Sequence, residues 1–223
     1  MFLLCAPDHC DSSTTSSPAI GLQRQSAFFN NTGTTESNIV LPNLLIDLQK
    51  RLQFSFRSCH SGQLVYQESG NGENSIAIEI DNLGKIKLIF RFENNVDQVQ
   101  MSTDRNLLDN QWYSLDILFE IGVINVIIEQ GRQRVESLFV SNSTFRSYLW
   151  TLDLSGSNGV IVGRNYTGCI QQGIGLSFDS VDTQVSGDVR WDVCLQPSSV
   201  GSCGEYCFPC VKHLCLVTAV GVS

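Results

Sequence analysis

Basic side chains are scarce in this sequence. Its 223 residues include 14 lysines and arginines against 22 aspartates and glutamates, which leaves a net charge of -8 at neutral pH. Phosphate backbones are bound by clustered lysine and arginine, so this balance excludes nucleic acid as the expected partner. It also disfavours heparin-like ligands and anionic membranes, although a local basic patch could survive a negative total.

Long apolar runs are also missing. The apolar tail Leu214–Val220 is far too short to span a bilayer, which takes about 20 residues. The first five residues have neither the basic n-region nor the length of a secretion signal. We therefore expect no membrane insertion by this segment.

A sustained helical period is absent, and a period of two takes its place. Because alternate side chains of a strand point to opposite faces, each alternating run predicts a strand with one buried face. Only one short helix is expected, over Asn43–Lys50. The residues expected to face inward are Leu52, Phe54 and Phe56; Ile76, Ile78 and Ile80; Ile86, Leu88, Phe90 and Phe92; Leu115, Ile117 and Phe119; Ile124, Val126 and Ile128; and Ile174, Leu176 and Phe178.

Glycine and asparagine separate the runs. Ser69–Gly72 and Asp81–Gly84 contain the residues that tight reversals need. Many short strands joined by such turns predict an all-β fold, an antiparallel sandwich or a jelly roll. After Cys194 the alternation stops. We expect a disordered head or linker over residues 1–21, one β domain over 22–196, and an irregular cysteine-rich tail over 197–223.

The nine cysteines are an odd number, which in a secreted protein implies at least one free or intermolecular thiol. Cys59 is expected either as a buried thiol or as the partner of a cysteine in the head. A nucleophilic dyad of Cys59 with His60 is excluded, because neighbours on a strand point to opposite faces. The cysteine-rich tail contains one C-x2-C pair, Cys207 and Cys210, with His213 nearby, which is a weak zinc signal. A truncated EGF-like repeat or an isoform end is the preferred interpretation of the tail.

Ordered motifs along the chain resemble one known family. Leu52–Ser58 contains the pattern F-x-F-R-[ST], and Gly62–Tyr66 contains G-x-L-x-Y. Leu108–Leu115 resembles L-x-D-x-x-W-H-x-V, with Tyr113 in place of the usual histidine, and Tyr166–Ile170 resembles F-x-G-C-I. Together they resemble the laminin G-like domain family, of the laminin α, neurexin, agrin, Crumbs and usherin type, over roughly residues 22–194.

This resemblance implies a concanavalin-like jelly roll of two antiparallel sheets, in agreement with the alternating pattern. It implies an extracellular recognition or adhesion module of a larger mosaic protein, in which EGF-like repeats often follow. It also implies a disulfide between Cys169 and Cys194, which on the chain-entropy model stabilises the fold by roughly 3 kcal/mol.

Three N-glycosylation sequons begin at Asn30, Asn142 and Asn165, all in expected loops. A chain this rich in asparagine, serine and threonine would contain roughly two or three by accident. The sugar sites therefore support an extracellular location but do not carry the argument for it.

Many members of the family bind one Ca²⁺ at the rim of a sheet. The resemblance places Asn74, with Glu73 beside it, at the first ligand position, and Asp153 and Ser155 near the second. Calcium takes six to eight oxygen ligands, and carboxylates set its affinity. Because one expected carboxylate is missing, we expect no cofactor, and calcium is the alternative.

The resulting hypothesis is a non-catalytic extracellular module that binds a protein or glycan partner through rim loops. These loops are Ser69–Asn74, Asn94–Gln98 and Ser155–Gly159. A structural spacer without a ligand and a lectin-like carbohydrate binder are the alternatives. An enzyme is disfavoured, because jelly-roll glycosidases need two inward carboxylates on one strand, whereas Glu79 and Asp81 share the solvent side.

Overall fold

The computed structural model describes six stretches of the chain: residues 24–47, 50–93, 95–101, 105–120, 123–140 and 152–195. Over these stretches the protein forms fourteen strands and one short 3-10 helix, η1 (Val193–Leu195). No helix in them is long and apolar enough to cross a membrane. Asn142 and the tail cysteines lie outside the described residues.

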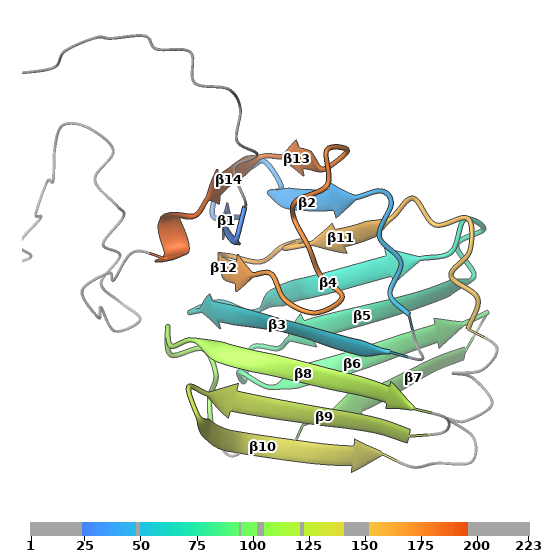
Figure 1. Cartoon of the computed structure of the whole chain (residues 1–223), viewed down its shortest axis with the longest axis horizontal. Coiled ribbons are helices and arrows are strands. Elements are labelled where there is room, and N and C mark those ends of the chain that lie inside the picture. The colour runs from blue at the N-terminus through green and yellow to red at the C-terminus, as the bar shows by residue number, and fades with distance from the viewer. Residues whose placement is uncertain are drawn as a thin grey trace, which may run out of the picture.

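The strands form two antiparallel sheets of seven strands each (Figure 1). Sheet A has the order β10 (Gln133–Val140), β9 (Val123–Gln130), β8 (Tyr113–Glu120), β3 (Arg51–Ser58), β12 (Gly168–Gln171), β1 (Ser26–Asn30) and β14 (Asp188–Trp191). Sheet B has the order β13 (Gln184–Ser186), β2 (Asn38–Leu41), β11 (Val160–Val162), β4 (Gly62–Glu68), β5 (Asn74–Ile80), β6 (Ile86–Phe92) and β7 (Asn95–Gln100). The expected all-β jelly-roll sandwich is confirmed.

The core lies between the two sheets, where the alternating runs place it. In β3, Leu52, Phe54 and Phe56 are exposed by 2% or less. The runs in β5, β6, β8 and β9 likewise turn their apolar side chains inward, into one continuous core. Full burial of one such side chain contributes roughly 1.5–3 kcal/mol, so a slip of one residue in any strand would be costly.

Sheet A is completed by strands that are far apart in the sequence. In register, Phe28 of β1 lies opposite Cys169 of β12 on one side and Arg190 of β14 on the other. β12 in turn pairs with β3, where Cys169 lies opposite Arg57. The first and last described segments of the chain therefore lie side by side at the upper end of the sandwich (Figure 1).

The helix expected over Asn43–Lys50 is wrong. A turn follows β2, in which the Leu44 N–H donates to Leu41 O at 3.1 Å, and no helix occurs in the described residues of this segment. Ile46 is buried, with its N–H bound to Gln67 Oε1 at 2.7 Å, whereas Leu45 is 57% exposed. Ile46 is thus held by its own burial and by a bond to the buried side chain of Gln67 in sheet B. These two contacts favour an irregular segment over a helix.

The strand expected over Ile174–Phe178 is also wrong. Gly173 and Leu176 instead close a tight turn by mutual backbone hydrogen bonds of 2.9 and 3.2 Å. Leu176 and Phe178 are buried as expected, but Ile174 is 51% exposed. A Cβ at Gly173 would lie 2.2 Å from Gln53 O, so glycine allows this turn to lie directly on β3.

Candidate functional site

Two loops meet at one end of the sandwich and form a surface that we call the rim: Ser69–Asn74, which joins β4 to β5, and residues 153–159, which precede β11. The Gly70 N–H donates to Ser155 O at 3.1 Å. A Cβ at Gly70 would lie 2.4 Å from Gly156 O, so the two backbones are in contact. Two of the three loops expected at the binding edge are therefore neighbours.

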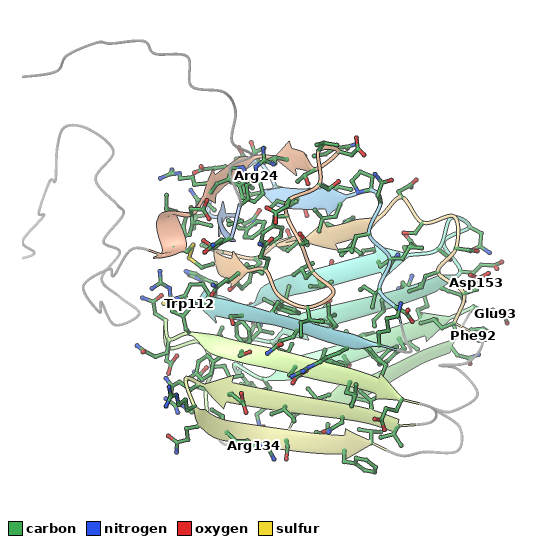
Figure 2. All side chains as sticks on the ribbon, in the orientation of Figure 1. Arg24, Phe92, Glu93, Trp112, Arg134 and Asp153 are labelled. Carbon is green, nitrogen blue, oxygen red and sulfur yellow. A yellow bond between two sulfur atoms is a disulfide. The ribbon has the colours of Figure 1, made fainter. Side chains whose placement is uncertain are left out.

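The third expected loop, Asn94–Gln98, is not a loop in its described part. Residues 95–98 belong to β7 and pair with β6, with Asn95 opposite Phe92. The reversal falls at Glu93, whose φ is 51°. Figure 2 shows Phe92, Glu93 and Asp153 at the same end of the molecule. The hypothesis of a binding loop at this position is therefore wrong for residues 95–98, because backbone pairing with β6 makes them part of an edge strand.

Asn74 is the buried centre of the rim. It is 8% exposed, and its Nδ2 donates to the backbone oxygen of Asp153 at 3.0 Å. Its Oδ1 is buried and has no hydrogen-bond partner among the described residues. The Asn74 N–H and carbonyl both bond to Ser69. Asn74 therefore links β5 to the loop before β11, which positions both halves of the rim.

The carboxylates of the rim are exposed and held by local hydrogen bonds. Asp153 accepts from the Ser155 N–H at 2.8 Å and from its hydroxyl at 3.0 Å. These two bonds lower the pKa of Asp153, with the backbone N–H as the larger cause. Glu73 Oε2 accepts from Asn71 Nδ2 at 2.6 Å. The lowered pKa keeps the Asp153 carboxylate ionised at neutral pH, and both acidic side chains are exposed to a partner.

These atoms match a calcium site of the family only in part. The rim brings Asn74 and Asp153 together, as the resemblance implied, but it is the amide NH₂ of Asn74 that faces the Asp153 carbonyl. The Asp153 carboxylate is turned toward Ser155. Throughout the described stretches, no group of three or more His, Cys, Asp and Glu side chains could hold a metal ion. An aligned amide donor and two carboxylates that are held by local hydrogen bonds do not fit a cation that needs six to eight oxygens.

The opposite end of sheet A contains the disulfide between Cys169 and Cys194, with a Cα–Cα distance of 6.0 Å. It ties β12 to η1, which directly follows the edge strand β14. Cys59 is disulfide-bonded as well, so it is not the buried thiol that was one of the two expectations for it, and its partner is not among the described residues. Cys59 and His60 lie in a bend after β3, not on a strand as assumed.

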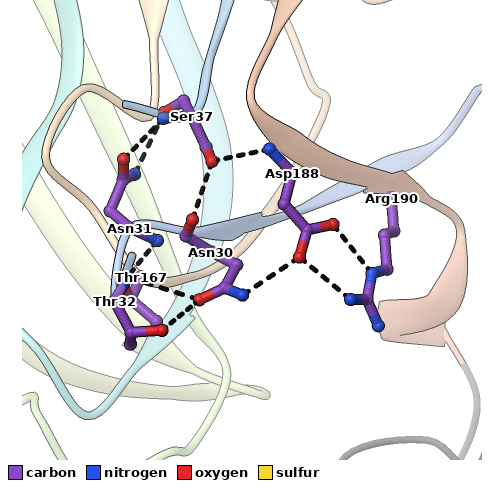
Figure 3. Close-up of polar contacts among 7 residues, drawn as sticks. All are labelled: Asn30, Asn31, Thr32, Ser37, Thr167, Asp188 and Arg190. Atoms are coloured by element: carbon purple, nitrogen blue, oxygen red, sulfur yellow. Dashed lines mark hydrogen bonds and ion pairs between the residues drawn. The ribbon is translucent and has the colours of Figure 1, made fainter. Parts of the chain in front are cut away.

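Asn31 is the centre of a polar network at this end (Figure 3). Its Nδ2 donates to the carbonyls of Ser37, Gly163 and Tyr166 at 2.6–3.2 Å, and its Oδ1 accepts from the Ser37 N–H. Its own N–H donates to Thr167 Oγ1 at 3.0 Å. Sequence reasoning considered this residue only as part of a sequon, since nothing in the local pattern marks a side chain that bonds residues more than 130 positions away.

The sequon asparagines differ in their surroundings. Asn165 is exposed, with a φ of 52°. Asn30 is half-buried, donates to Asp188 Oδ2 at 3.0 Å and accepts from both the N–H and the hydroxyl of Thr32 (Figure 3). Asp188 also forms two hydrogen bonds of 2.9 Å with Arg190, so Asn30 belongs to a connected charged network.

Two arginines stack on tryptophans away from the rim. Arg57 lies 5.3 Å from the ring of Trp112, and burial lowers its pKa. Arg24 lies 4.7 Å from the ring of Trp191. Figure 2 shows Trp112 at the opposite end of the molecule from Asp153. These stacks attach β3 and the start of the domain to their neighbours and add nothing to the rim.

Two seven-stranded antiparallel sheets over a single apolar core, with rim loops at one end and a disulfide at the other, define a jelly-roll binding domain. The family model of the laminin G domain matches residues 54–173. That match covers more than half of the chain, and the chain belongs to the laminin G domain family. Members of this family are extracellular, non-catalytic binding modules.

A solved structure shows the same fold, and a second is similar in sequence. The LG1-3 region of the laminin alpha2 chain is 16% identical, with a TM-score of 0.59, over 77% of this chain and 35% of that chain. Domains LG4-5 of the mouse laminin alpha1 chain are also 16% identical, with a TM-score of 0.47, over 82% of this chain and 51% of theirs. The chain thus spans between about a third and a half of the length of these structures.

Proposed function

We propose that this domain recognises an extracellular protein or glycan partner through the rim, without catalysis. The observation that carries the proposal is the direct bonding of the two loops, Gly70 N–H to Ser155 O and Asn74 Nδ2 to Asp153 O. Loops that are held together before binding lose less conformational freedom when a partner is bound. A rigid sandwich that presents such loops is the usual arrangement of a recognition module.

The chemistry of the rim favours hydrogen-bond donors and cations in the partner. Asn71, Glu73, Asp153, Ser155 and Asn158 are all exposed. Two of them are carboxylates, and the whole chain has a net charge of -8. A lysine- or arginine-bearing protein surface or a hydroxyl-rich neutral glycan complements these groups, whereas a sulfated glycan would be repelled.

We also propose that the rim needs no calcium. The Asn74 amide bonds the Asp153 carbonyl directly and so holds the two loops together. Glu73, Asp153 and Ser155, the other candidate ligands, are then free to contact a partner. If calcium did bind here, Asn74 Oδ1 and the Asp153 carboxylate would be its protein ligands, and that alternative is tested in the Discussion.

The extracellular assignment extends to the rest of the chain as a proposal. It comprises a head over residues 1–21, the laminin G domain over 22–196, a cysteine-rich tail over 197–223, and glycans on Asn30, Asn142 and Asn165. A peptide map of the secreted, non-reduced protein tests it. The expected result is a linked Cys169–Cys194 peptide together with a glycan on the exposed Asn165. Free thiols and bare asparagines in folded, secreted protein would overturn it.

The rim itself is tested by capture from extracellular matrix extract. The wild-type domain is compared with a variant in which Asn71, Glu73, Asp153 and Asn158 are all changed to alanine. Loss of captured partners in this variant supports the rim. The matched control is Arg134→Ala, an exposed residue at the far edge of sheet A (Figure 2), which should capture normally. Equal capture by the rim variant and the wild type would refute the placement, and capture of nothing by the wild type would favour a structural spacer.

A further inference from the structure

Five apolar side chains form a single row across the outer face of sheet B. Their positions are in direct register on five neighbouring strands: β2, β11, β4, β5 and β6. Figure 1 shows these strands one beside the next in that order. The row, which we call the outer stripe, consists of Val40, Ile161, Tyr66, Ala77 and Ile89.

The outer stripe faces away from the core. Its members alternate with core residues that are almost fully buried, such as Ile39, Val160 and Leu88. Four of its members are themselves partly exposed, and only Ala77, at 6%, is buried. With strands about 4.8 Å apart, the five positions span roughly 19 Å at right angles to the strands.

Polar side chains flank the stripe along β4, β5 and β6 and at its two ends. One flanking row contains Glu68, Ser75 and Arg91, and the other contains Gln63, Glu79 and Lys87. The stripe ends at Gln184 on β13 and at Gln98 on β7. The two acids and two bases of the flanking rows cancel in charge, in a chain whose net charge is -8. This part of the surface therefore offers hydrogen-bonding groups without a net electrostatic preference.

Tyr66 is the one aromatic residue of the stripe. The pKa of Tyr66 is raised, mainly by burial and further by the charge of Glu68, while Ser75 and Arg91 act to lower it. The hydroxyl is therefore placed among the groups of one flanking row, while the ring lies in the stripe next to Ala77. A tyrosine so placed presents an apolar ring face and a polar tip to the same ligand.

We propose that the outer stripe is a binding surface for a linear, uncharged oligosaccharide. A pyranose ring has an apolar face, which the stripe would cover, and hydroxyls around its edge, which both flanking rows would bond. The spacing of the strands is close to the length of one sugar unit, so successive units would lie over successive strands. The small side chain of Ala77 leaves space for a ring beside Tyr66.

An extended peptide fits this surface less well. Peptides that bind sheets do so by adding a strand to an unpaired edge, with pockets for alternate side chains. All five strands of the stripe are paired on both sides, so they offer no free backbone groups. The stripe is also separate from the rim, and the two sites can succeed or fail independently.

The first test is an array of immobilised neutral, sialylated and sulfated oligosaccharides. We expect the wild-type chain to bind neutral glycans of four or more units in preference to charged ones. Binding to no neutral glycan would overturn the proposal, and so would a preference for sulfated ones. A peptide library that yields binders to the stripe while every neutral glycan fails would assign the surface to peptides instead.

The second test locates the binding site. With the best neutral hit in solution, Ile89→Ser and Tyr66→Ser should weaken affinity at least tenfold, and amide chemical shifts should move along the stripe. Ile127→Ser is the matched control, because Ile127 is partly exposed on the outer face of the other sheet, on a strand paired on both sides, and should bind normally. Val40→Thr, nearly isosteric, serves if a serine variant fails to fold. Shifts confined to the rim, or an equal loss in Ile127→Ser, would overturn the assignment.

Discussion

The two ends of this sandwich are held together in different ways. At the Asn31 end, the disulfide and most bonds of the Asn31 network join residues that are 25 to 136 positions apart, and the bonds to Ser37 span six. At the rim, most hydrogen bonds are local, such as those between Asp153 and Ser155 or between Asn71 and Glu73. Among the residues that the structure describes, two bonds between the loops cross the rim, Gly70 to Ser155 and Asn74 to Asp153.

The difference separates stability from recognition. Long-range bonds cannot form until the whole fold is in place, so losing one destabilises the whole domain. Local bonds shape a loop without supporting the core, so rim residues whose bonds are local, such as Asn71, can change with little effect on folding. Binding residues commonly lie on loops held by a rigid scaffold for this reason.

Removal of the disulfide should have the largest effect. The double variant Cys169→Ala/Cys194→Ala should lower the free energy of unfolding by about 3 kcal/mol, because the unfolded chain regains the freedom of a closed loop. Denaturant unfolding of the secreted protein measures the loss. The rim control, Asn158→Ala, is exposed and should cost less than about 0.5 kcal/mol. Equal losses of unfolding free energy in the two variants would contradict the proposed difference between the two ends.

Loss of the Asn31 side chain should come next. Asn31→Ala removes three donated hydrogen bonds and one accepted bond, which should cost about 2–3 kcal/mol because half-buried carbonyls lose their partner. The comparison is Asn71→Ala, whose bonds reach only two residues along the chain and which should cost less than about 1 kcal/mol. Thermal unfolding of both variants measures the difference. If Asn31→Ala were as stable as Asn71→Ala, the long-range bonds of Asn31 would not stabilise the domain as stated.

Asn74→Asp should make the rim respond to calcium. The change removes the NH₂ donor that bonds Asp153 O and adds a carboxylate. Without calcium it should therefore cost about 1–2 kcal/mol. Millimolar calcium should raise the melting temperature of this variant, by about 2–4 °C for each kcal/mol of binding. The wild type should not respond, nor should Asn31→Asp, the matched asparagine-to-aspartate change at the other end. If calcium raised the melting temperature of the wild type, the proposal that the rim needs no calcium would be wrong.

The smallest expected effect concerns pH. Hydrogen bonds from Arg190 and Asn30 lower the pKa of Asp188 in the folded state. A lowered folded pKa stabilises the domain above the unfolded value of about 3.9, and this contribution is lost as pH falls through the folded value. Asp188→Asn should therefore cost less than about 1 kcal/mol at pH 7, since the pair is partly exposed, and the difference from wild type should vanish in acid. Urea unfolding across pH measures it, and a difference that does not change with pH would contradict this cause.

Several elements could be predicted from the sequence because their signals are local. The alternating runs located β3, β5, β6, β8 and β9 and the faces they bury, since the pleat of a strand makes side-chain direction a matter of parity. Ser69–Gly72 and Asp81–Gly84 were predicted as reversals. Gly72 and Gly84 adopt φ values of 74° and 72°, a region that glycine enters at little cost.

The failures share one cause. The segment 43–50 was taken for a helix and 174–178 for a strand, but contacts with Gln67 and β3 from elsewhere in the chain determine both. Residues 95–98 were expected in a loop, yet β6 lies beside them and pairs with them. Local composition does not include the partner that a segment will meet.

For the candidate sites, the sequence alone determined which residue types were present and, through the family resemblance, that Asn74 and Asp153 belong to one rim. The structure decided that the amide of Asn74 bonds the Asp153 backbone and that the Asp153 carboxylate is turned toward Ser155. It also decided that Val40, Ile161 and Tyr66 are neighbours on one face. Which side chains of a strand face the core is encoded within a few residues. Strand order and register instead depend on pairing segments that can be more than a hundred residues apart, and only the folded core selects among the possible pairings.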